Sequence, residues 1–68
     1  MKDLNTVIAL NETRHGLAVI VLVLAWQDGT QELKTFLSGT GALNFAAAKL
    51  RPHYGSIVAE LRSIGAIS

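Results

Sequence analysis

The chain contains no cysteine among its 68 residues, and only 16% of them are charged. Without cysteine, neither a disulfide nor a thiolate metal site can stabilise so small a protein. The absence fits a reducing compartment, and we predict a cytoplasmic protein. Half of the residues are apolar, and this composition excludes intrinsic disorder.

Charge of either sign is also scarce, because six basic residues face five acidic ones and the net charge is +1. This is too small a charge to indicate a nucleic acid or an anionic membrane as a partner. The longest apolar run has ten residues, 17–26, and a membrane-spanning helix needs about 20. Because Leu24-Ala25-Trp26 does not have the small-x-small pattern of a cleavage site, we predict no signal peptide.

Residues that could carry chemistry are few and scattered. The chain has two histidines and five carboxylates, and no local spacing suggests a nucleophile with its base. His15 and His53 are the sole imidazoles, too few for a zinc site without cysteine. We therefore predict a non-enzymatic protein with no catalytic residue, metal site or cofactor.

The segment 17–26 reads Leu-Ala-Val-Ile-Val-Leu-Val-Leu-Ala-Trp and is rich in β-branched residues. Such residues favour a strand over a helix, and Gly16 and Gly29 interrupt the sequence at either side. An apolar run without alternation predicts a strand that is buried on both faces.

Residues 1–16 allow two interpretations. Thr6–Leu10 contains a β-branched cluster that predicts a strand at about 5–11, followed by a polar loop up to Gly16. Helical spacing is the alternative, with Asp3 as the N-cap and Gly16 at the end. We favour the strand, because the neighbouring strand is long.

Asp28-Gly29 is the clearest local signal in the chain. This dipeptide favours the positive φ of a type I′ turn, which joins two antiparallel strands. The partly alternating residues 31–37 predict the strand that follows, with Leu33 and Leu37 on one face.

A helical pattern follows this strand. Apolar residues predict a helix at about 42–51 with Thr40 as its N-cap, and Pro52 disfavours continuation. A second helix is expected at about 53–64, ended by Gly65. The sequence thus predicts one α+β domain over residues 1–68, with a β-meander of two or three strands followed by two short C-terminal helices.

The predicted central strand requires more cover than two helices provide. Alternate residues of a strand point to opposite faces, and the helices cover one face only. We therefore predict a homodimer, formed by packing sheet on sheet or by pairing strand edges. The residues assigned to self-association are Ile20, Leu22, Leu24 and Trp26.

The leading functional prediction is a regulatory or inhibitory module that acts through protein–protein contacts. The alternative is a small DNA-binding regulator, because the two predicted helices match the spacing of a helix-turn-helix over residues 42–65. A third hypothesis is peripheral association with a membrane. The residues available to contact DNA or another partner are Lys49, Arg51, His53, Tyr54 and Arg62.

Overall fold

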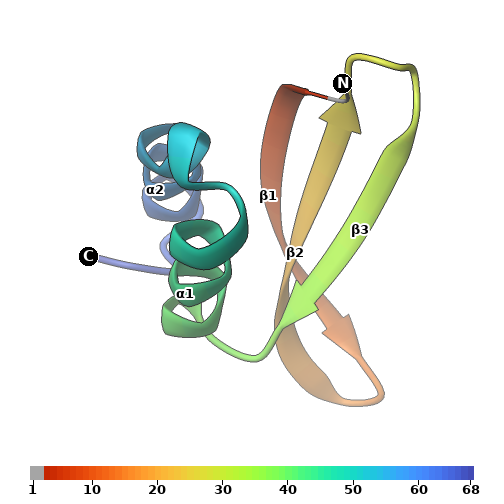
Figure 1. Ribbon diagram of the computed structural model, residues 1–68. Coiled ribbons are helices and arrows are strands. Elements are labelled where there is room, and N and C mark those ends of the chain that lie inside the picture. The colour runs from red at the N-terminus through yellow and green to blue at the C-terminus, as the bar shows by residue number, and fades with distance from the viewer. Residues whose placement is uncertain (1–2) are drawn as a thin grey trace.

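The computed structural model describes residues 3–68 and shows a three-stranded antiparallel sheet with two helices on one of its faces (Figure 1). The predicted α+β arrangement is confirmed, and the strand order in the sheet is β1-β2-β3. In chain order the elements are β1 (Leu4–Arg14), β2 (Leu17–Trp26), β3 (Gln31–Phe36), α1 (Gly39–Lys49), the 3-10 turn η1 (Arg51–His53) and α2 (Tyr54–Ser63).

The first hairpin is longer than the sequence indicated. β1 continues to Arg14 instead of ending at Asn11, because the turn into β2 takes only two residues. These are His15 and Gly16, with φ values of 53° and 79°. Two successive positive φ values define a type I′ turn, whose twist matches that of the flanking strands. The polar residues before Gly16 therefore extend the strand and do not form a loop.

The second hairpin forms where Asp28-Gly29 predicted it, but the predicted type I′ turn is wrong. The Gly29 N–H donates to the Trp26 carbonyl at 3.0 Å, and the Trp26 N–H donates to the Thr30 carbonyl at 2.9 Å. Gly29 has a φ of 91°, whereas Asp28 keeps a negative φ and its carboxylate accepts bonds from the Thr30 backbone and hydroxyl. This is a three-residue loop with a glycine in the left-handed region.

A β-bulge sets the side-chain directions at the start of β1. Leu4 pairs with Trp26 and Thr6 pairs with Ala25, so Asn5 is an extra residue in the ladder. The bulge turns Leu4 toward the same side of the sheet as Val7, and the two side chains are buried beneath the helices.

The helix ends correct part of the prediction. Ser38, not Thr40, is the N-cap of α1, and its hydroxyl accepts a bond from the Gly41 N–H at 3.2 Å. α1 therefore begins at Gly39, three residues before the predicted start at 42. It ends at Lys49, two residues before the predicted end at 51. Pro52 lies in η1, and α2 begins and ends one residue inside the predicted 53–64 range.

Gly65 ends α2 as predicted. It has a φ of 75°, and its N–H donates to the Arg62 carbonyl at 3.0 Å. The Ala66 N–H donates to the Leu61 carbonyl at 2.9 Å. This pair of bonds is a Schellman motif, which satisfies carbonyl groups left open at the end of a helix.

The hydrophobic core lies between the helices and one face of the sheet. Leu22 and Leu24 of β2 meet Ile57 and Leu61 of α2, and each is at most 1% exposed. α1 contributes small residues, which allow close approach to the sheet. The buried core residues are Leu4, Val7, Ala9, Ile20, Leu22, Leu24, Ala42, Ala46, Leu50, Ile57 and Leu61.

Candidate functional site: the open face of the sheet

The face of the sheet opposite the helices is not covered by any described element (Figure 1). Side chains alternate along a strand, and the core residues Val7 and Ala9 point to the helices. Their neighbours Ile8 and Leu10 therefore point to the other side, together with Leu33 of β3.

The register brings apolar residues of all three strands together on this open face. Ile8 is paired with Val23, and Val23 is paired with Leu33, so the three form a row across the sheet. Leu10 lies beside this row, opposite Val21. We call Ile8, Leu10, Val23 and Leu33 the open-face patch.

The large members of the patch are well exposed. Ile8 is 46% exposed, Leu10 is 41% exposed and Leu33 is 61% exposed. Complete burial of such a side chain is worth about 1.5–3 kcal/mol, so these three together forgo about 2–4 kcal/mol. The whole free energy of unfolding of a chain this size is about 3–10 kcal/mol. Covering the patch would thus add substantially to stability.

Polar side chains bound the patch toward the first hairpin. Arg14 bonds Glu12 through Nε at 3.1 Å and reaches the Thr35 hydroxyl at 3.4 Å. Since Arg14 is on β1 and Thr35 on β3, with β2 between them, this contact crosses the open face above β2. An apolar centre with a polar rim is the usual anatomy of a protein-binding surface.

The residues assigned to self-association from the sequence lie on the other face. Ile20, Leu22 and Leu24 are 7%, 0% and 1% exposed and are in the core, with Trp26 packed against it. Three of the four are buried within one chain and Trp26 is partly buried, so the assignment of this face to self-association is wrong. The two faces of β2 are almost equally apolar, and within the run only the larger size of the side chains on the covered face distinguishes it.

The side-chain pattern of β3 also favoured the wrong face of the sheet as the exposed one. β3 ends at Phe36, so Leu37 lies just after the strand, and Leu33 and Leu37 are 61% and 78% exposed. Glu32 and Lys34 point to the side of the helices and form an ion pair with 3.6 Å between Nζ and Oε2. Their side chains are 38% and 43% exposed, so these two charges at the margin of the sheet remain in contact with water.

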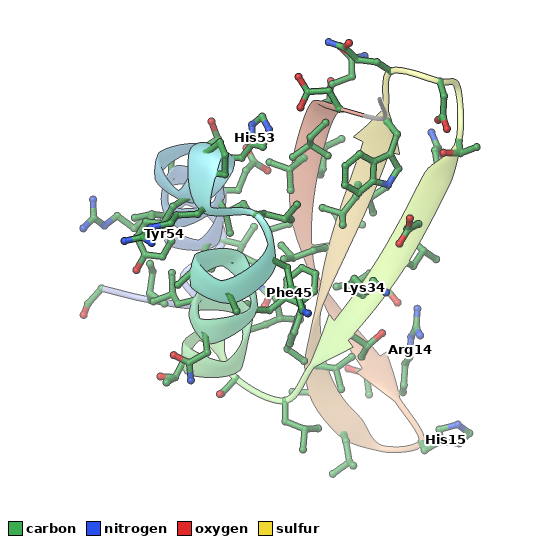
Figure 2. The ribbon with its side chains drawn as sticks, in the orientation of Figure 1. Arg14, His15, Lys34, Phe45, His53 and Tyr54 are labelled. Atoms are coloured by element: carbon green, nitrogen blue, oxygen red, sulfur yellow. The ribbon has the colours of Figure 1, made fainter. Side chains whose placement is uncertain are left out.

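The five candidate DNA or partner contacts are spread over the helical layer. Tyr54 and Arg62 line a shallow groove of about 600 Å³ between the helices and the C-terminal segment. Lys49 and Arg51 are exposed and do not line it. His53 lies 3.5 Å from the Asp3 carboxylate, measured from Nε2 to Oδ1. Figure 2 shows Tyr54 on the side of the helices that faces away from the sheet. The helix-turn-helix interpretation stays a prediction.

Residues 3–68 contain no group of three or more histidine, aspartate or glutamate side chains that could hold a metal ion. In the same range, neither helix has the length and apolar character needed to cross a bilayer. The chain matches no protein-family model, and no curated protein or solved structure is significantly similar to it.

Proposed function

We propose that this chain is a small non-enzymatic regulatory or inhibitory module, which works as a homo-oligomer and binds another protein through the open-face patch. The observation that carries the proposal is the row of Ile8, Val23 and Leu33, which joins three strands into one apolar surface. Exposed apolar patches of this kind commonly mark interaction sites. We place its action in the cytoplasm, in keeping with the absence of cysteine.

An open apolar sheet face suits protein recognition better than catalysis. It offers apolar contact with hydrogen-bonding groups at the margin, namely Thr35, Arg14 and Glu12. The net charge of +1 supplies little attraction for DNA, whose binding depends on contacts with phosphates. These features favour a protein partner over a nucleic acid.

Site-specific photo-crosslinking tests the proposal. The photoreactive residue p-benzoylphenylalanine replaces Leu10 in one variant and Lys49 in a control variant, and each is irradiated in cells of the source organism. Both side chains are exposed, so the fold should accept either replacement. We expect a defined protein adduct from position 10 and none from position 49, with adduct masses read by mass spectrometry.

Two outcomes would contradict the proposal. One is the absence of any protein adduct from position 10. The other is an adduct from position 49 alone, which would assign recognition to the helical layer and favour the DNA-binding alternative if the adduct contains nucleic acid.

A further inference from the structure

The two edges of the sheet differ in how they are protected. At the edge of β1, the Glu60 carboxylate accepts a bond from the Ala9 N–H at 3.0 Å. Beside it, the Asn11 side-chain amide donates to the Ile64 carbonyl at 2.8 Å. α2 therefore closes the middle of this edge. No described segment lies alongside the outer edge of β3 (Figure 1).

The second hairpin determines which backbone groups this edge presents. The Trp26 N–H bonds the Thr30 carbonyl, and Leu24 is paired with Glu32. In an antiparallel ladder, residues bonded to the neighbouring strand alternate with residues whose N–H and C=O point away from it. Even-numbered residues of β3 therefore face β2. Gln31, Leu33 and Thr35 present their backbone N–H and C=O groups outward.

An edge with a row of outward donors and acceptors is a template for another strand. We propose that β3 pairs antiparallel with β3 of a second copy of this chain, with Leu33 opposite the partner's Leu33. This inference rests on the homo-oligomer of the proposed function. It adds that the copies associate through the edge of β3, with Leu33 at the centre of the pairing. Two bonds in each of three residue pairs would then use all the outward groups of Gln31, Leu33 and Thr35.

The charges of Glu32 and Lys34 favour the pairing centred on Leu33 over the pairings centred one residue to either side. A two-fold pair that matches the outward groups can be centred on residue 32, 33 or 34. Centring on residue 32 places Glu32 opposite the partner's Glu32, and centring on residue 34 places two lysines opposite each other. Centring on Leu33 places Glu32 opposite the partner's Lys34, twice by symmetry. Opposite charges stabilise directly facing positions in a sheet, and like charges destabilise them.

The pairing also concentrates the apolar surface. A two-fold axis perpendicular to the sheet joins the strands into one six-stranded sheet, with all the helices on one side. The two Leu33 side chains then meet at the centre of the open face. The open-face patches of both copies become neighbours on a single surface, which is available to the proposed protein partner.

Charge reversal in a mixing experiment tests the register. The variants are Glu32→Lys, Lys34→Glu and the double exchange Glu32→Lys with Lys34→Glu, measured by sedimentation equilibrium. The side chains of Glu32 and Lys34 are 38% and 43% exposed, so circular dichroism should report an unchanged fold. We expect the wild type and the double exchange to form dimers of twice 7.3 kDa.

Each single variant should dimerise at least about tenfold more weakly, because like charges then face each other at two symmetric positions. An equimolar mixture of the two single variants should regain the wild-type affinity, since every facing pair in the mixed dimer is again of opposite charge. The differences should shrink in high salt, which screens exposed charges.

Two results would overturn the inference. One is that each single variant dimerises as tightly as the wild type. The other is that the mixture associates no better than the single variants alone. If the wild type dimerises while either result is found, the register is wrong but the association remains. If the wild type stays monomeric, the homo-oligomeric part of the proposed function fails as well.

Discussion

Leu22→Ala is expected to lower the free energy of unfolding by about 3–5 kcal/mol, because it leaves a cavity at the centre of a closely packed core. Leu22 is 0% exposed and lies between the helices and the sheet. The total stability of such a chain is about 3–10 kcal/mol. Much of the variant should therefore be unfolded in the absence of denaturant, as measured by urea titration followed by circular dichroism.

Leu33→Ala is the matched control, since Leu33 is also a strand leucine but is 61% exposed. In a dilute sample it should cost less than about 1 kcal/mol, as most surface substitutions do. The loss caused by Leu22→Ala should not depend on protein concentration, because the side chain is buried within one chain. Equal losses from the two variants would contradict the assignment of the faces.

Gly39→Ala is the second substitution with a large expected effect. A β-carbon on Gly39 would collide with the carbonyl oxygen of Ala66 and with Cγ2 of Ile67, where the C-terminal segment crosses the start of α1. One of the colliding atoms belongs to the backbone, so relief requires the whole segment to shift. We expect a loss of about 1–3 kcal/mol, the usual cost of overpacking.

Gly55→Ala serves as its control. Gly55 lies in the first turn of α2, and a β-carbon there would meet nothing within 4 Å. Alanine favours a helix over glycine, so this variant should gain up to about 1 kcal/mol. Thermal unfolding of both variants checks the pair. A Gly39→Ala variant as stable as the wild type would show that the C-terminal segment does not pack against α1.

Local chemistry made the elements of this fold predictable. The β-branched run of β2, the Asp28-Gly29 turn and the glycine at position 65 act over a few residues and depend little on the rest of the chain. The local predictions that were wrong, the N-cap of α1 and the type of the second turn, each chose between two options of similar energy. Ser38 and Thr40 are both good N-caps, and Asp28-Gly29 suits two kinds of turn.

The open face was missed for a different reason. Which side of β2 the helices cover depends on the path from β3 into α1, and not on the apolar character of either face. The larger residues Ile20, Leu22 and Leu24 face the helices, while Val19, Val21 and Val23 face away. This difference in size was a usable signal. The charges of Glu32 and Lys34 indicated the wrong face as the exposed one, because they lie on the side of the helices at a margin of β3 that remains in water.

The most direct test of the account is hydrogen exchange by NMR at increasing protein concentration, followed at the outward amides of Leu33 and Thr35. These amides have no partner strand within the described chain. Association through β3 would place them in a new ladder. We expect their exchange to slow as the concentration rises, while the amide of Ala59, which lies in α2 away from β3, changes less. Rapid exchange of Leu33 and Thr35 at millimolar concentration would contradict the account.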